Sequence, residues 1–85
     1  MEKIYKDMAL KAQGFAKAAT MRYCTINGLE PAKFAEDAEM TVTVAPGFGT
    51  MQVWSHLGKV VAKLDFTKKT IESFDKRREI LDAKS

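Results

Sequence analysis

Few side chains in this chain have the chemistry of a catalytic or metal-binding residue. The sequence contains one cysteine, Cys24, and one histidine, His56, and they fall in different predicted elements. A metal site needs three or four converging His, Cys, Asp or Glu ligands. A Cys–His nucleophile pair needs a third residue that orients the histidine. Because the spacing supplies neither, we predict no metal, no cofactor and no catalysis by this pair.

Two other short patterns also fail as catalytic motifs. The carboxylates of Glu36, Asp37 and Glu39 follow one another in a helix-to-strand connection, where a solvated acidic patch is the usual explanation. The loop Pro46-Gly47-Phe48-Gly49 is rich in glycine, but it lacks the following Gly-Lys-Ser/Thr and the helix of a phosphate-binding loop. We therefore predict that the protein is not an enzyme.

Length and composition indicate one small globular domain spanning residues 1–85. The chain is 46% hydrophobic and 29% charged, with a net charge of +3, which is ordinary for a folded protein. A single cysteine cannot form an internal disulfide, so a cytoplasmic location is expected. No apolar run approaches the ~20 residues needed to cross a membrane, and the N-terminus does not resemble a secretion signal.

The segment Met40 to Phe66 organises the predicted fold as a three-stranded antiparallel meander. Apolar and polar residues alternate along it, and Pro46-Gly47 and Gly58 mark the two turns. The alternation predicts one buried apolar face, so Val42→Asp should unfold the domain. That face holds Met40, Val42, Val44, Met51, Val53, Val60, Ala62, Leu64 and Phe66.

The opposite face of this meander is predicted to be mixed in character. Thr41, Thr43, Gln52, Trp54, Val61 and Lys63 fall on it. Trp54 is its most unusual member. It either packs on neighbours such as Val61 or anchors a partner, because tryptophan is enriched at interface hot spots. Phe48, at a hairpin tip, either folds back onto the sheet or forms an exposed contact.

A long helix is predicted from Glu2 to about Ile26, followed by a short one within 29–38. Apolar residues spaced by three and four from Ile4 to Ile26 form one stripe, and Asn27-Gly28 is a good stop. Pro31 suits the first position of the short helix. Leu10 and Met21 form a weaker strip on the other side of the long helix, which packs locally or forms a homodimer.

The C-terminus permits two interpretations. Thr67 is a suitable N-cap for a final helix that places Ile71 and Phe74 on one side. The alternative is a fourth strand at Thr70 to Ser73, with a helix beginning near Phe74. A basic cluster in this region alternates with acidic residues, as in a solvated helix face. The alternative is that the cluster binds nucleic acid. Its members are Lys68, Lys69, Lys76, Arg77 and Arg78.

The predicted order of helix, three strands and helix is similar to that of the double-stranded RNA-binding domain. Lys68 and Lys69 stand where that family has a lysine cluster opening its last helix. The resemblance implies nucleic-acid binding. Two features depart from the family pattern: Ala45-Pro46-Gly47-Phe48 replaces its Gly-Pro-x-His element, and the alanine-rich last helix is missing.

We therefore predict a two-layer α+β domain of order α-β-β-β-α, with both helices on the apolar sheet face. The predicted function is a small non-catalytic binding or regulatory module, such as an accessory or inhibitor protein of a phage or mobile element. Its protein-binding surface would comprise Trp54, Phe48, Leu10 and Met21. The alternative is a nucleic-acid-binding domain that uses Lys68, Lys69, Lys76, Arg77 and Arg78.

Overall fold

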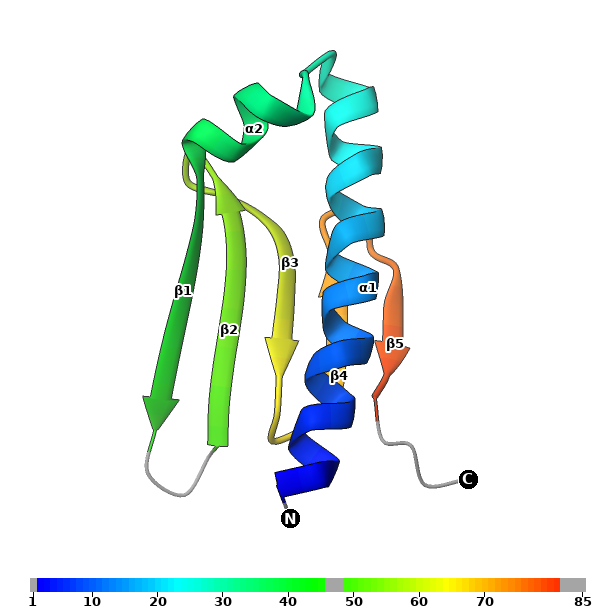
Figure 1. Ribbon diagram of the computed structural model, residues 1–85, viewed down its shortest axis with the longest axis vertical. Coiled ribbons are helices and arrows are strands. Elements are labelled where there is room, and N and C mark those ends of the chain that lie inside the picture. Colours follow the sequence, from blue (N-terminus) through cyan, green and yellow to red (C-terminus); the bar gives the residue numbers. More distant parts are fainter. Residues whose placement is uncertain (1, 46–48, 82–85) are drawn as a thin grey trace.

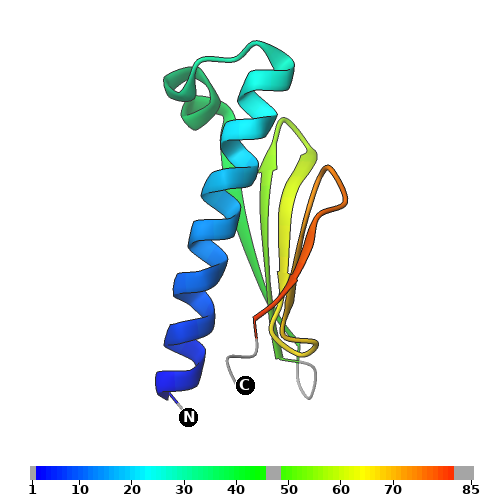
Figure 2. The same ribbon diagram turned by 90° about the vertical axis from the view of Figure 1, so that its right-hand side faces the viewer.

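One antiparallel sheet and one long helix form the two layers of the domain (Figures 1 and 2). The computed structural model describes residues 2–45 and 49–81. The sheet has five strands in the order β1-β2-β3-β4-β5. The elements are α1 (Glu2–Asn27), α2 (Pro31–Asp37), β1 (Ala38–Ala45), β2 (Gly49–His56), β3 (Lys59–Asp65), β4 (Thr70–Ser73) and β5 (Arg78–Ile80).

Helix α1 packs on the sheet through a narrow stripe of mostly small side chains. Met8, Ala12, Ala16, Ala19 and Tyr23 are all buried and recur at helical spacing. Alanine allows the helix backbone to approach the strands closely, and it has the highest helix propensity. The predicted long helix is thus confirmed over Glu2–Asn27.

Both predicted helix boundaries around residue 28 are also confirmed. Gly28 ends α1 with a φ of 64°, a left-handed conformation that glycine adopts without steric cost. Helix α2 begins at Pro31 after Glu30, which makes no side-chain cap bond. Phe34 of α2 is buried in the core, and Leu29 packs against that core from just before the helix.

The predicted C-terminal helix and the α-β-β-β-α order are wrong, because residues 70–80 add two more strands. The strand at Thr70–Ser73 that the sequence left as an alternative is confirmed as β4. No helix begins near Phe74; a turn leads into β5. The element order is therefore not that of the double-stranded RNA-binding domain, and the resemblance ends with it.

Side-chain capping and burial explain why this segment forms strands. The Oδ1 atom of Asp65 accepts the backbone N–H of Thr67 at 2.9 Å and that of Lys68 at 3.1 Å. This Asx-type turn reverses the chain where the sequence predicted a helix N-cap. Ile71 then lies opposite Leu64, and both are fully buried. Long-range burial of Ile71 therefore outweighs the local helical pattern of charges.

The predicted face of β2 is also wrong, because this strand pairs one residue out of the expected register. Residues directly opposite each other in an antiparallel pair share a face. Trp54 lies opposite both Met40 and Ala62, so it faces α1 rather than the open side. Val53 lies opposite Lys63, which places it on the open face.

A β-bulge alters the burial of two neighbouring valines in β3. The register shifts at Trp54 and Ser55, so that Ser55 pairs with Val60 and Trp54 pairs with Ala62. Val61 is the extra residue and is fully buried, whereas Val60 is 48% exposed. Both outcomes reverse the prediction. Val42 is also half exposed, so the expectation that Val42→Asp unfolds the domain is not supported.

Helix α1 covers only part of the sheet. It packs on β3 and β4, and in Figure 1 it stands in front of β4 while β1 and β2 lie to one side. The short helix α2 bridges α1 and the start of β1 at one end. The helix-facing surface of β1 and β2 is therefore left largely open.

Candidate functional site: an apolar groove beside helix α1

The open part of the sheet forms one wall of an apolar hollow, which we call the α1–β1 groove. Its volume is about 320 Å³. Residues of α1, α2, β1 and β2 all contribute to its lining, so four elements meet there. The lining residues are Thr20, Phe34, Ala35, Ala38, Glu39, Met40, Trp54 and Ser55.

The strand register places the two large side chains of the groove next to each other. Met40 of β1 lies directly opposite Trp54 of β2, and opposed residues stand on the same sheet face. Met40 is 55% exposed. Trp54 is half-buried and packs against the hydrophobic core with part of its surface. The pair therefore joins the core to an accessible apolar surface.

Helices α1 and α2 close two sides of the groove. Thr20 follows the buried Ala19, and successive residues in a helix are turned by about 100°. This turn directs Thr20 away from β4 and towards the β1 side. Phe34 and Ala35 of α2 lie at the end where β1 begins. The groove is thus bounded by α1 along one side and by α2 at one end.

The chemistry of the lining suits apolar contacts. Glu39 is the one charged residue among those that line the groove. Within residues 2–45 and 49–81, no three His, Cys, Asp or Glu side chains are grouped so that they could hold a metal ion. The groove therefore offers a mainly apolar surface.

A buried aromatic cluster supports the groove from beneath α2. The ring of His56 stacks on Phe34, with 5.1 Å between centroids and 10° between planes. Tyr23 meets both of these rings edge-on, at 5.4 Å from His56 and 5.8 Å from Phe34. The Tyr23 hydroxyl and Nδ1 of His56 are hydrogen-bonded at 3.1 Å. Tyr23 of α1, Phe34 of α2 and His56 of β2 therefore each contact the other two rings.

His56 is buried where α1, α2 and β2 meet. It is only 4% exposed, so a substrate cannot reach its ring. Its Nε2 atom lies 4.0 Å from Oδ2 of Asp37, beyond hydrogen-bond distance, and has no hydrogen-bond partner within the described residues. Cys24 is a buried free thiol. Both residues that could have formed a Cys–His pair are therefore buried.

A second polar cluster ties α1 to the turn between β4 and β5. Arg22 forms a bidentate pair with Asp75, with Nε–Oδ2 and Nη2–Oδ1 distances of 2.7 and 3.2 Å. Ser73 also donates its hydroxyl to Asp75. Hydrogen bonds from Arg22 and then Ser73 hold the pKa of Asp75 well below its usual range. These bonds fasten the helix to the β4 side of the sheet.

The residues predicted to bind protein do not form one surface. Trp54 lines the α1–β1 groove, but Leu10 and Met21 are 58% and 63% exposed on α1. Each of these follows a buried residue by two positions, Met8 and Ala19, which turns it about 200° away from the sheet. Phe48 lies outside the described residues.

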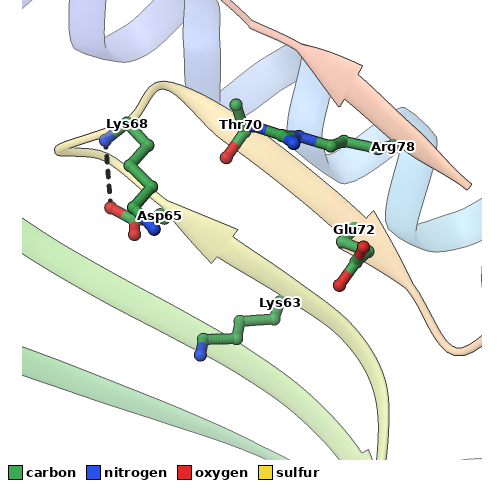
Figure 3. Close-up of a pocket in the computed structure, with 6 residues that line it drawn as sticks. All are labelled: Lys63, Asp65, Lys68, Thr70, Glu72 and Arg78. Carbon is green, nitrogen blue, oxygen red and sulfur yellow. Dashed lines mark hydrogen bonds between the residues drawn. The ribbon is translucent and has the colours of Figure 1, made fainter. Parts of the chain in front are cut away.

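The predicted basic cluster is also divided. Lys68 and Lys69 lie in the turn before β4, and Lys76 and Arg77 lie in the turn after it. Arg78 begins β5 and shares the open sheet face with a shallow hollow of about 200 Å³ (Figure 3). The hollow mixes both signs of charge, being lined by Lys63, Asp65, Lys68, Thr70, Glu72 and Arg78.

Of the eight residues that line the groove, sequence reasoning assigned Trp54 alone to a binding surface. Thr20 and Ala35 carry no pattern that separates them from an ordinary helix surface. Met40 was assigned to the core, because a period-two pattern shows that alternate residues share a face but not whether that face is covered. Sequence data alone gave no signal for how far α1 reaches across the sheet.

Comparisons with known proteins identified no relative of this chain. No protein-family model, curated protein or solved structure matches the chain. Among the described residues, no helix has the length and apolar character needed to cross a membrane.

Proposed function

We propose that this protein is a non-catalytic binding module whose α1–β1 groove receives the apolar side of an amphipathic helix from a partner protein. The observation that supports this most directly is the partial cover of one sheet face. Helix α1 packs on β3 and β4, while Met40 and Trp54 stand on the same face beside it, next to an apolar hollow.

The dimensions of the uncovered surface match one helix. Strands in a sheet are about 4.8 Å apart, so β1 and β2 together present a surface roughly 10 Å wide. A helix with its side chains is also about 10 Å in diameter. The eight residues of β1 extend for about 27 Å, which is the length of a helix of about 18 residues.

The side chains on this surface suit a helical partner. Met40 is flexible and adapts its shape to different apolar groups. Trp54 is already held by the core on one side, so little entropy is lost when a partner covers the other. Apolar residues at i, i+3, i+4 and i+7 of the partner would meet this pair.

A charge beside the groove favours one orientation of the partner's polar residues. Lys17 is exposed on α1, three residues before Thr20 and so on the same flank of the helix. A partner helix with acidic residues towards α1 would complement this lysine.

The test uses a displayed library of helical peptides with one randomised apolar face. We expect selected peptides to bind the native chain and to lose at least tenfold in affinity for Met40→Gln, measured by titration calorimetry. The matched control is Met21→Gln, the same substitution at a methionine of similar exposure on the far side of α1. It should leave affinity unchanged.

Two results would overturn the proposal. The first is that helical peptides show no enrichment over a library of extended peptides. The second is that Met40→Gln and Met21→Gln weaken the selected peptides equally. Circular dichroism of both variants confirms that each remains folded.

A second candidate function is nucleic-acid binding on the open sheet face. It is supported by Lys63, Lys68 and Arg78, which surround the hollow in Figure 3. Asp65 and Glu72 lie between these cations and oppose a phosphate backbone. Binding of a labelled oligonucleotide that weakens steeply with added salt would favour this candidate.

A further inference from the structure

The two edges of the sheet differ in how they are protected. Strand β5 is only three residues long, and two of them, Arg78 and Glu79, are charged and exposed. Strand β1 is eight residues long and has one charged residue, Glu39, near its start. Short strands and charges are the usual means by which proteins prevent their edges from pairing with another chain. The β5 edge has both, whereas the β1 edge has neither over most of its length.

The outer side of β1 carries backbone groups that the sheet does not pair. Strand β1 is the terminal strand in the order β1-β2-β3-β4-β5 and pairs with β2 alone among the described strands. In an antiparallel ladder, alternate residues direct their N–H and C=O groups to the neighbouring strand, and the others direct theirs outward. The outward groups of β1 form a regular row of donors and acceptors about 27 Å long.

We infer that a second copy of this chain pairs with that edge, so that β1 of each copy forms an antiparallel ladder across a two-fold axis at Val42. The two five-stranded sheets then form one continuous sheet. An antiparallel edge is self-complementary, because a two-fold rotation places its donors opposite acceptors of the same sequence. The inference depends on the strand edge and not on what occupies the α1–β1 groove.

The sequence of β1 suits this pairing. An axis at Val42 places Val42 opposite itself, and pairs of β-branched residues stabilise neighbouring strands. It also leaves Ala38, where β1 follows α2, outside the ladder.

The charge distribution permits the same arrangement. Glu39 of each copy lies opposite Ala45 of the other, so the two carboxylates stand at opposite ends of the ladder, about 20 Å apart. At physiological ionic strength that distance exceeds the screening length of about 8 Å. The ladder therefore contains no pair of like charges in contact.

The dimer would also extend the groove. A two-fold axis perpendicular to the sheet keeps both α1 helices on the same face, as each covers its own β3 and β4. The uncovered β1 and β2 strands of the two copies then lie between the helices, with Met40 and Trp54 of each on the shared floor.

The first test is sedimentation velocity of the native chain over a range of concentrations. Edge pairing alone buries less surface than the ~1,200 Å² of a stable standard interface, so we expect a reversible dimer with a Kd in the micromolar range. Thr41→Lys places two positive charges beside the axis and should weaken association at least tenfold. Thr67→Lys makes the same change at an exposed turn far from β1 and should not alter it.

A cross-linking experiment tests the axis itself. Cβ atoms directly opposite each other in a ladder are about 5 Å apart, so Val42→Cys should form a disulfide-linked dimer under mild oxidation. Thr67→Cys provides the exposed-cysteine control, and the native Cys24 is buried.

Three results would overturn the inference. One is a native chain that stays monomeric up to about millimolar concentration, the range in which only very weak complexes dissociate. Another is a dimer that Thr41→Lys leaves intact, which would place the contact away from β1. A dimer that the double variant Leu10→Gln, Met21→Gln dissociates would likewise place the contact on α1. The third is a dimer in which Val42→Cys links no faster than Thr67→Cys.

Discussion

The two halves of one sheet face show how strongly a single helix determines the role of apolar residues. Under α1, Ala62, Leu64 and Ile71 are fully buried. Beside α1, Met40 and Val42 occupy equivalent positions on the same face but are 55% and 50% exposed. The residues of the two halves are similar in type, and all of these strands belong to one hydrogen-bonded sheet. What differs is whether a helix lies over them.

The position of α1 has identifiable causes. Its alanine stripe allows close contact with β3 and β4, and the Arg22–Asp75 pair holds it on the β4 side. Covering β1 and β2 as well would require a second helix, because one helix is about as wide as two strands. The chain supplies only the seven residues of α2 there, at one end. The half of this face formed by β1 and β2 is therefore left largely uncovered.

The largest expected effect compares one substitution in the two halves. Leu64→Asp places an unpaired charge under α1 and should unfold the domain, since the cost is comparable with the whole stability of a small domain, about 5–10 kcal/mol. Val42→Asp should remain folded and lose about 1 kcal/mol, mainly through lower strand propensity. Circular dichroism and thermal melts distinguish these outcomes. If both variants fold or both unfold, the contrast between the halves is wrong.

A smaller effect is expected at the aromatic cluster that supports the closed end of the groove. Tyr23→Phe keeps the ring contacts with His56 and Phe34 but removes the buried hydroxyl bonded to Nδ1 of His56. We expect a loss of about 1–2 kcal/mol in urea denaturation, because a buried polar atom is left without its partner.

The control for this prediction is Thr25→Val, which removes an exposed hydroxyl bonded to the carbonyl of Met21. Its expected effect is within about 0.5 kcal/mol. Equal losses in the two variants would mean that the bond between Tyr23 and His56 contributes nothing specific to stability.

The smallest effect is expected for the Arg22–Asp75 ion pair, which holds α1 over the β3 and β4 half of the sheet face. Because the pKa of Asp75 is lowered in the folded protein from its ordinary value of 3.8, its carboxylate stabilises the fold at pH values above about 4. That contribution is lost as the pH falls below 4 towards the lowered value. Asp75→Asn should therefore melt at a lower temperature at neutral pH and show a smaller further loss at acid pH.

Asp7→Asn, at an exposed carboxylate of α1, should retain the acid sensitivity of the native chain. Melting temperatures between pH 2 and 7 provide the measurement. An acid dependence of Asp75→Asn that matches the native chain would show that the Arg22–Asp75 pair does not contribute to it.

Local sequence determined several elements of this protein directly. The long helix, its end at Gly28, the start of α2 at Pro31 and the β2–β3 turn at Gly58 all follow from residues that act within one or two turns of chain. Leu57 and Gly58 both have positive φ, as a two-residue hairpin turn of type I′ requires. Three adjacent antiparallel strands were likewise predicted from period-two alternation.

The remaining features depended on contacts between residues distant in the sequence. The charges around residues 68–79 fit a helix locally, but burial of Ile71 against Leu64 favoured strands. The face on which Trp54 stands depended on a one-residue choice of register, which alternation cannot reveal. To predict the groove, one would also have to know how far α1 extends across the sheet.

The sequence by itself therefore determined which segments are helical and where the chain turns, since these depend on backbone preferences and capping. Only the tertiary structure decided which apolar residues are core and which form a surface. Apolar character makes Leu64 and Met40 equally suitable for burial, and packing under α1 is available to one of them alone.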